Sequence, residues 1–420
     1  MRSSMIKGDR RVKKGITRQK QLVVTILAIA LATLLLFTAC APTPLQEEKQ
    51  VVKVGYVACL TGPAAAIMQV GWRNLVDYLK YFEEVGVPGL DLPPGVTIEL
   101  VWGDTGMEAT RAISVYERIH GDVVFCHVPD AISAHALKSR LERDEMAVMT
   151  MVPDEDLMYP PGWVFTVFST ESERFAAWCD WIMENWGENR PPRVGMMGMD
   201  TPAGRAAEVM GTAYAESIGI EMLPFEHFPY TPLDVSPQLL RLAESKADFI
   251  YMQAHWGTSP PIIRDAERLG LVGKIGFAVA TEDGLAIPLL ELGTAVEGLS
   301  QAKCFPWYEE VPIVYDIFRE YGGRLDTSGG IACTLQYGPV PIEAIRIAIE
   351  KVGYENLDGR AVKEAFYSIK DFDPHNIGRP VTYTPEDNRG APEVRIYEIR
   401  GGKVVPATDW RESPMLVPEE

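Results

Sequence analysis

Basic residues are scarce in this 420-residue chain, which has 40 lysines and arginines against 58 aspartates and glutamates. The formal net charge is therefore −18 at pH 7. Nucleic-acid binding needs basic patches that face the phosphates, so this composition argues against a nucleic-acid partner. It also argues against adhesion to anionic lipid through surface charge. The acidity otherwise indicates only solubility.

The sequence also lacks the short motifs of common catalytic sites. It has no G-x-S-x-G elbow, no H-E-x-x-H helix, no Walker loop and no G-x-G-x-x-G after a predicted strand. Its six histidines are scattered, without the spacing of metal ligands. We therefore expect a protein that is not an enzyme, with no cofactor and no metal.

Cysteines are few, and none forms a C-x-x-C pair. Apart from Cys40 there are five, an odd number that cannot be fully paired: Cys59, Cys126, Cys179, Cys304 and Cys333. An oxidising compartment would permit one or two disulfides, but the sequence does not assign them. At least one of these thiols is expected to be a small buried hydrophobe.

The N-terminus has the pattern of an export signal. Eight of the first twenty residues are basic, and the apolar run Leu22–Phe37 follows them. That run is short for a membrane span, which favours cleavage. It ends in Phe37-Thr38-Ala39-Cys40, which resembles a bacterial lipobox, where the cysteine thiol receives a diacylglyceryl group. A plain signal peptide and an uncleaved anchor are the alternatives.

Cleavage before Cys40 would remove eight basic residues and one acidic residue, so the mature chain would be more acidic still. Residues 1–39 are thus predicted as the signal peptide. Residues 40–50 are a polar, proline-containing linker suited to holding a domain away from the bilayer. We expect the mature protein at the outer face of the membrane, in the periplasm or outside the cell, anchored at Cys40.

From Val51 onward, short apolar runs alternate with amphipathic stretches, which is typical of β-α units and a largely parallel sheet. The first series of predicted strands is 51–60, 97–102, 123–126, 147–151 and 163–168, with helices at 64–84, 107–120 and 132–144. A second series has strands at 193–198, 221–228, 248–251 and 274–278, with helices at 172–184, 201–217, 236–245 and 259–269. A strand at 296–304, helices at 311–321 and 332–352, and antiparallel strands at 381–383, 394–400 and 403–405 follow.

The two series predict an α/β fold of two doubly wound parallel-sheet lobes, joined by a multi-strand hinge. The expected division is 51–168 for lobe 1, 169–300 for lobe 2, 301–370 for a return to lobe 1, and 371–420 for a C-terminal return to lobe 2 and the hinge. Ligands of such sheets bind at the carboxyl ends of the strands. Two facing lobes would form a cleft that closes by hinge motion.

Four strings resemble, in order, the branched-chain amino acid/amide group of periplasmic binding proteins (the leucine/isoleucine/valine-binding type). They are Val54–Ala66, with its Leu-Thr-Gly-Pro-Ala loop; Val101–Asp104, a strand ending in Asp; Gly198–Arg205, similar to an Asp-x-x-Tyr-Gly turn; and Val381–Gly390, similar to the C-terminal hairpin entry. The resemblance covers roughly residues 51–410. It implies a type I periplasmic binding protein that passes a small-molecule ligand to ABC permease subunits.

By this resemblance, the ligand contacts lie in the loops 61–69, 127–130, 150–154, 200–204, 254–257 and 281–283. Ile67 and Ala203 stand where amino-acid binders commonly have an aromatic residue and a tyrosine, and Asp130 stands where a serine is usual. These departures argue against a standard amino acid as the ligand.

The candidate ligand-binding residues are Thr61, Asp130, Thr150, Met151, His255, Trp256, Glu282 and Trp307. Asp130 and Glu282 could pair with a ligand cation, because opposite charges attract strongly in a dry cleft. The aromatic residues could form the walls of the cleft. Threonines near helix N-termini could help bind a carboxylate or carbonyl. Solvated loop carboxylates, lobe packing and helix capping are the alternatives.

The sequence therefore predicts a lipid-anchored solute-binding protein of an ABC importer. The expected solute is a small organic molecule of the amino acid, amide or aromatic acid class. The main alternative is a ligand-sensing domain that presents the same fold to a membrane receptor. A secreted hydrolase on an α/β scaffold is a third possibility.

Overall fold

Five parallel strands form the first sheet, in the order β2-β1-β3-β4-β5. They are β1 (Gln50–Ala58), β2 (Val96–Asp104), β3 (Phe125–His127), β4 (Val148–Met149) and β5 (Val164–Phe165). The computed structural model describes residues 50–418 except 256, 281–286 and 322–336, so Cys40, Trp256, Glu282 and Cys333 lie outside the described residues. Because all five strands are parallel, their carboxyl ends meet at one edge of the sheet.

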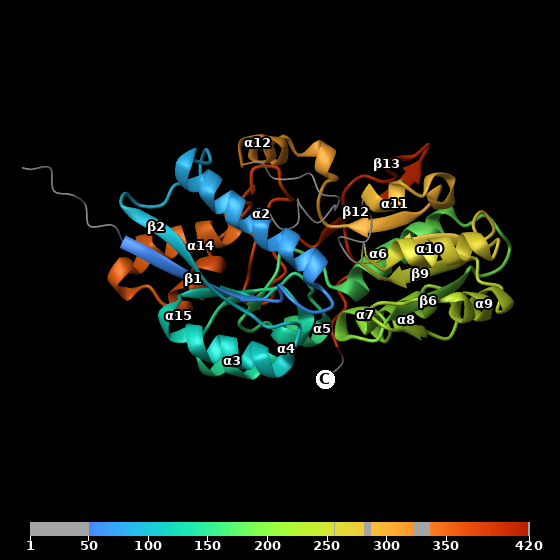
Figure 1. Cartoon of the computed structure of the whole chain (residues 1–420), viewed down its shortest axis with the longest axis horizontal. Coiled ribbons are helices and arrows are strands. Elements are labelled where there is room, and N and C mark those ends of the chain that lie inside the picture. Colours follow the sequence, from blue (N-terminus) through green and yellow to red (C-terminus); the bar gives the residue numbers. More distant parts are fainter. Residues whose placement is uncertain (1–49, 256, 281–286, 322–336, 419–420) are drawn as a thin grey trace, which may run out of the picture. The chain divides into compact units, whose positions relative to one another are not determined.

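Side chains alternate along β1, and each face of the first sheet is covered by helices (Figure 1). Val57 packs in a cluster with α3 (Ala109–Ile119) and α4 (Ala131–Arg143). Val52 and Val54 pack on the other face with α14 (Pro339–Val352) and α15 (Gly359–Phe366). Helix α2 (Ala65–Glu84) covers Tyr56 on that same face through Leu75. The sheet is therefore buried on both faces, as the prediction of a doubly wound lobe requires.

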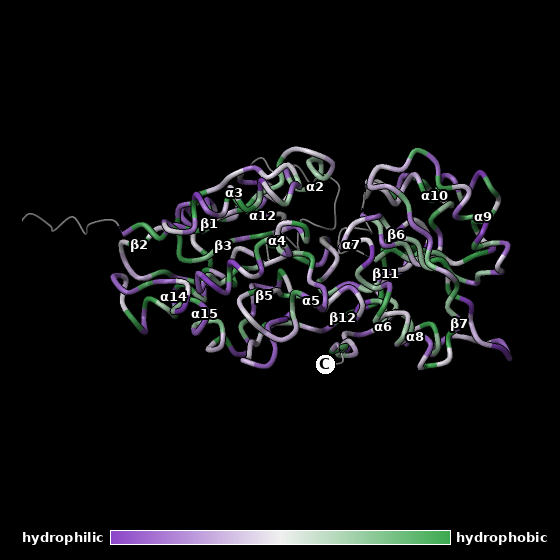
Figure 2. Tube along the Cα trace, turned by 90° about the horizontal axis from the view of Figure 1, so that it is seen from below, coloured by the Kyte–Doolittle hydropathy of each residue, from purple (hydrophilic) through white to green (hydrophobic). Residues whose placement is uncertain are grey.

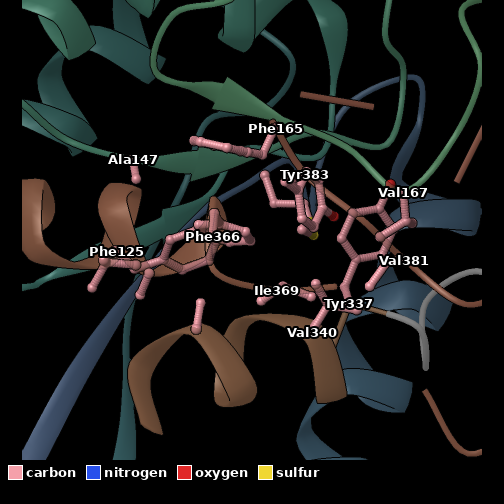
Figure 3. Packing of buried hydrophobic residues seen from close by; sticks show 14 of the residues in the cluster. Phe125, Ala147, Phe165, Val167, Tyr337, Val340, Phe366, Ile369, Val381 and Tyr383 are labelled. Carbon is pink, nitrogen blue, oxygen red and sulfur yellow. The ribbon is translucent and has the colours of Figure 1, made fainter. Parts of the chain in front are cut away.

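Figure 3 shows the core of the first lobe, where residues far apart in the sequence meet. Phe366 stacks on Phe165 with ring centroids 4.3 Å apart, and Tyr383 meets Phe165 edge to face. The Tyr383 hydroxyl donates a hydrogen bond of 2.9 Å to the Thr166 carbonyl. The segment after residue 304 thus contributes Phe366 and Tyr383 to this core, and the predicted boundaries at 301–370 and 371–420 stay a prediction.

The second sheet has nine strands, and they do not all run in the same direction. Its main path is β13-β12-β11-β10-β9-β6-β7, with β8 on β6 and β14 on β12. The strands are β6 (Arg193–Met199), β7 (Glu221–Met222), β8 (Glu226–Phe228), β9 (Phe249–Gln253), β10 (Gly276–Val279), β11 (Ser300–Lys303), β12 (Glu393–Arg400), β13 (Lys403–Pro406) and β14 (Arg411–Glu412). Pairing is parallel up to β11, and β12 joins β11 antiparallel. The predicted antiparallel finish is confirmed for 394–400 and 403–405.

Helices cover both faces of the second sheet as well. On one face, α6 (Glu171–Asn185) and α8 (Met210–Ser217) pack around Trp178 and Tyr251. On the other face, α9 (Ser236–Glu244) and α10 (Ser259–Arg268) pack around Ile250 and Met252. The hydropathy colouring in Figure 2 accordingly shows hydrophobic stretches along the strands and polar residues on the outer loops. The remaining helices include α5 (Glu155–Met158), α7 (Pro202–Arg205), α11 (Ile287–Leu290) and α12 (Pro312–Tyr321).

Several predicted elements differ from the observed ones. The predicted helix 201–217 is broken into α7 and α8, and Val209, just before α8, is 76 % exposed. The predicted strand 221–228 is interrupted between β7 and β8, where Pro224 supplies no N–H for a ladder. The predicted strand 381–383 forms only an isolated bridge, Val381 to Phe372. Helices α5 and α15 were not predicted.

Three segments connect the cores of the two lobes, and two of them are hydrogen-bonded to each other. Thr166 N donates to Asn388 O at 3.0 Å, and the Ser169 hydroxyl donates to Pro392 O at 3.0 Å. The third segment follows β11, where Phe305 packs in the first core and Trp307 in the second. Cys59, Cys126 and Cys179 are buried free thiols, and Cys304 is buried as well. Among the described residues, no helix has the length and apolarity needed to span a membrane.

Candidate functional site

Asp104 fixes the loop that follows β1. Its Oδ1 accepts hydrogen bonds from the backbone N–H groups of Leu60 (2.8 Å), Thr61 (3.0 Å) and Gly106 (3.1 Å), and its Oδ2 accepts from the Thr61 hydroxyl (2.6 Å). Desolvation raises the pKa of Asp104, but the hydrogen bonds from Thr61, Gly106 and Leu60 outweigh it and hold the pKa below its usual range. Thr61 is therefore exposed at the sheet edge while its hydroxyl is held by this carboxylate.

Asp130 follows β3 and is the N-cap of α4. Its Oδ1 accepts from Ser133 N at 2.8 Å, and the residue is only 2 % exposed. Its Oδ2 is buried, and the Cys59 thiol lies close by. Burial raises the pKa of this carboxyl. Asp130 therefore has a capping role in this structure, and its ligand contact stays a prediction.

Thr150 and Met151 follow β4 and lie beside an apolar floor. The Thr150 carbonyl accepts a hydrogen bond of 2.7 Å from the Tyr337 hydroxyl. Met151 lines a small pocket with Tyr56, Leu75, His127, Pro129, Met149 and Tyr337. Burial lowers the pKa of His127 to about 3, so this ring is neutral at physiological pH. This pocket, of about 10 Å³, has room for one water molecule at most, so the apolar area at this strand end comes from Met151, which is partly exposed.

The second lobe places His255 just beyond β9. Its Nδ1 accepts from Gly257 N at 2.9 Å, and its ring lies 4.8 Å from that of Tyr230, centroid to centroid. Trp307 is only 3 % exposed and packs in the core of the second lobe, while its backbone N–H donates to the Tyr397 hydroxyl at 3.3 Å. Packing, the alternative given for Trp307, accounts for its position, and a ligand contact there stays a prediction.

Gln253 is a buried polar residue that the sequence prediction missed. It is the last residue of β9, and its Nε2 donates to Ala203 O at 3.0 Å and to Glu171 Oε2 at 3.4 Å. Glu171 in turn forms a buried ion pair with Arg174 in the first turns of α6. These bonds join the loop after β6 to the start of α6. The available signal was a glutamine ending the otherwise apolar strand Phe249–Gln253.

One described cavity of about 560 Å³ has walls from both lobes. From the first lobe come residues of α4 and of the segment after β4; from the second come residues of α7 and the turn after it. The lining is His135, Asp154, Glu155, Asp156, Pro202, Arg205, Ala206, Val209, Met210 and Pro418. This volume lies within the range of small-molecule sites. Asp154 and Pro202 belong to two of the predicted contact loops, 150–154 and 200–204, but none of the candidate ligand-binding residues that the structure describes lines this cavity.

Two pairs of polar groups lie at this cavity. His135 Nε2 lies 2.6 Å from Asp154 Oδ2, and this hydrogen bond raises the pKa of His135. Across the cavity, Arg205 Nη2 lies 2.8 Å from Asp200 Oδ1. Between residues 50 and 418, gaps aside, no group of three His, Cys, Asp or Glu side chains is placed to hold a metal ion.

Comparison with known proteins gives one family match and many structural ones. A family model described as "Periplasmic binding protein" matches residues 51–403. No match was found among curated proteins. A branched chain amino acid ABC transporter structure from Thermus thermophilus, with bound valine, is 22 % identical with a TM-score of 0.78, covering 87 % of this chain and 97 % of that one.

Two further solved structures, of proteins described for other solutes, show the same fold. A fatty acid ABC transporter substrate-binding protein from Thermomonospora curvata has a TM-score of 0.75 at 19 % identity, covering 90 % of this chain and 98 % of that one. A solute binding protein of an ABC transporter from Rhodopseudomonas palustris BisB5, in complex with 3,4-dihydroxy benzoic acid, has a TM-score of 0.68 at 16 % identity, covering 87 % and 98 %. At these identities the likeness establishes the fold, and the solute does not follow from it.

Proposed function

Because this chain belongs to the periplasmic binding protein family, we propose that it is the lipid-anchored solute-binding protein of an ABC importer. It captures a small organic solute of the amino acid, amide or aromatic acid class between its two lobes. The observation that supports this function best is the placement of strand-end loops from both lobes around shared space, including the cavity of about 560 Å³.

Met151 is partly exposed where β4 ends, and the residues packed beneath it are apolar or, in His127, neutral. This environment favours a solute with an apolar or aromatic part. Of the structurally similar proteins named above, one carries valine, one carries 3,4-dihydroxy benzoic acid and one is described as a fatty acid ABC transporter substrate-binding protein. The fold therefore accepts solutes with apolar or aromatic parts. The departures at Ile67, Ala203 and Asp130 argue for an amide or aromatic acid over a standard amino acid.

A thermal-shift screen of the mature chain tests the proposal. The panel holds amino acids, amides, urea and aromatic acids, and a ligand at 100 times its Kd adds about 2.7 kcal/mol to the free energy of unfolding. We expect one chemical class to raise the melting temperature, with 1:1 binding in calorimetry and no turnover. Conversion of the compound would favour an enzyme, and no shift with any class would contradict solute capture.

The aromatic wall predicted in the second lobe gives a residue-level test. Trp256→Ala should weaken binding of the solute found in that screen by roughly 1–3 kcal/mol, because stacking and apolar contact area are lost. Calorimetry measures this affinity, and unfolding without solute measures stability. Leu233→Ala is the matched control, since Leu233 is an exposed apolar residue in the turn before α9. Unchanged affinity with a large loss of stability would assign Trp256 to the core instead.

The lipid anchor is tested at Cys40. The chain with Cys40→Ala should accumulate as soluble or uncleaved protein, because the thiol that would receive the lipid is gone. Labelled fatty acid should be incorporated into the wild-type chain and not into this variant, while Cys59→Ala, at a buried thiol, should still incorporate it. Absence of label from the wild-type chain would contradict lipidation, whatever the solute.

A further inference from the structure

Glu155 is a buried carboxyl group placed between the two lobes. It is the first residue of α5, in the first lobe, and it is 6 % exposed. Its Oε1 has no hydrogen-bond partner among the residues that the structure describes. Glu155 also lines the cavity of about 560 Å³, whose opposite wall is α7 of the second lobe.

The start of α6 is the other neighbour of this carboxyl group. Thr170 caps α6 and, with Ser172, interacts with Glu155. The segments are also joined through the backbone, since Glu171 N donates to Pro153 O at 3.3 Å. Helix α6 begins directly after the first connection between the lobes, so Glu155 lies beside a hinge segment.

The charged groups around Glu155 do not neutralise it. On α6, Glu173 raises the pKa of Glu155, and Glu173 already binds Arg389 at 2.6 Å. On its own segment, Asp154 is bonded to His135 of α4, and Asp156 is exposed. On α7, Arg205 is paired with Asp200. Burial is the main cause that raises the pKa of Glu155, to about 7, and the hydrogen bonds of Thr170 and Ser172 offset it only in part.

We propose that Glu155 is a proton-dependent positioning residue that controls the opening between the lobes. The neutral carboxyl group favours a narrow cavity, because it can be enclosed without losing the hydration of a charge. The carboxylate favours a wider cavity, which admits water to the charged group. The inference rests on the proposed function, because hinge closure around a solute is what this residue would regulate.

The sign of the effect follows from this arrangement. The pKa of Glu155 is higher in the closed state than in the open state, so closure takes up a proton. Acidification through neutral pH therefore favours closure, and solute affinity rises as the pH falls. The Glu155→Gln variant has no charge to hydrate at this position. It should therefore behave at every pH as the wild type does at low pH.

Two measurements on the mature chain without solute test the proposal. In 13C-glutamate NMR, the wild type should show one carboxyl titrating near pH 7 that is missing in Glu155→Gln. In small-angle scattering from pH 5.5 to 8.5, the radius of gyration should increase with pH for the wild type and stay constant for Glu155→Gln. Asp156→Asn is the matched control one residue along α5 and should respond like the wild type. Glu155→Met is a second neutral variant, should the glutamine variant fold poorly.

Other outcomes overturn the proposal. A scattering response that persists in both neutral variants, or a wild type with no pH response, contradicts a role for Glu155. Loss of the response in His135→Asn, with the response kept in Glu155→Gln, would assign the effect to the His135–Asp154 pair. Since neither measurement uses a solute, failure of the solute screen and failure of this inference are separate results.

Discussion

The two lobes differ in how much of each is built from adjacent sequence. The first sheet takes all five strands from residues 50–165, in parallel pairing throughout. The second sheet combines strands from 193–303 with strands from 393–412; β12 runs antiparallel to β11, and β13 and β14 each run antiparallel to β12. In the first lobe, one continuous stretch of chain supplies the whole sheet, and the C-terminal helices α14 and α15 pack against it. In the second lobe, the sheet is complete only when the C-terminal strands β12, β13 and β14 have joined it.

The strand-end loops differ in the same way. In the first lobe, Asp104 and Asp130 hold their loops through bonds within that lobe, mostly to neighbouring backbone N–H groups. In the second lobe, Gln253 connects a strand end to α7 and to the start of α6. The comparison indicates that the first lobe presents a prearranged surface, while the second lobe's surface depends on a segment next to the hinge.

The largest expected effect tests whether the two cores contribute equally to one folding unit. Phe366→Ala in the first core and Trp178→Ala in the second should each lower the free energy of unfolding by about 3–5 kcal/mol, because each ring is fully buried among aromatic neighbours. Urea unfolding followed by circular dichroism measures both. A single transition that shifts in both variants is expected; two separate transitions, one for each variant, would show that the lobes unfold independently.

The next effect concerns the connection between the lobes. Arg389 binds Glu173 of α6 at 2.6 Å and also Asp387, and both Arg389 and Glu173 are buried. Arg389→Met should cost about 3 kcal/mol, since it leaves the Glu173 carboxylate buried without its cation. Arg140→Met, which breaks a more exposed pair with Glu117, should cost about 0–1 kcal/mol in the same urea experiment. Equal losses would contradict a special role for the buried pair.

A smaller effect concerns how the free energy of unfolding depends on pH through a buried histidine of the first lobe. His127 of the first lobe has a pKa near 3 in the folded chain, and an ordinary value near 6.5 applies once it is unfolded. The unfolded chain therefore binds the extra proton below pH 6.5, and stability falls as the pH decreases toward 3. The expected slope from this residue is about 1.4 kcal/mol per pH unit. It should disappear in His127→Leu when unfolding is measured between pH 6.5 and 4.5, and an unchanged slope would exclude His127 as its source.

Much of the fold followed from periodicity because both sheets are buried on two faces. The predicted helix 64–84 is α2 (Ala65–Glu84), and the predicted strand 193–198 is β6 (Arg193–Met199). The failures were local: α5 has only four residues, too few for a period, and its signal was the cap at Asp154, which accepts from Leu157 N at 2.9 Å. The break before α8 has no signal in hydrophobic spacing alone.

The site was harder to predict than the fold. A carboxylate in a strand-end loop can bind a ligand cation or cap a helix, and the sequence around Asp130 is compatible with both; the structure shows the cap. Gln253 and Glu155 were missed because their importance comes from partners distant in the sequence, namely Ala203 for Gln253 and Thr170 for Glu155. Trp256 and Glu282 lie outside the described residues, so their contacts stay predictions.

The antiparallel strand β12 also has a consequence for biogenesis. It pairs with β11 from Ser300 opposite Glu398 to Lys303 opposite Arg395, and so covers an edge that would otherwise offer free backbone groups. In a chain that crosses a membrane N-terminus first, β11 emerges about 90 residues before its partner. During that interval, or permanently in a product truncated near residue 390, the open edge can template intermolecular pairing. Shielding of the β11 edge until β12 has paired with it would therefore limit intermolecular pairing.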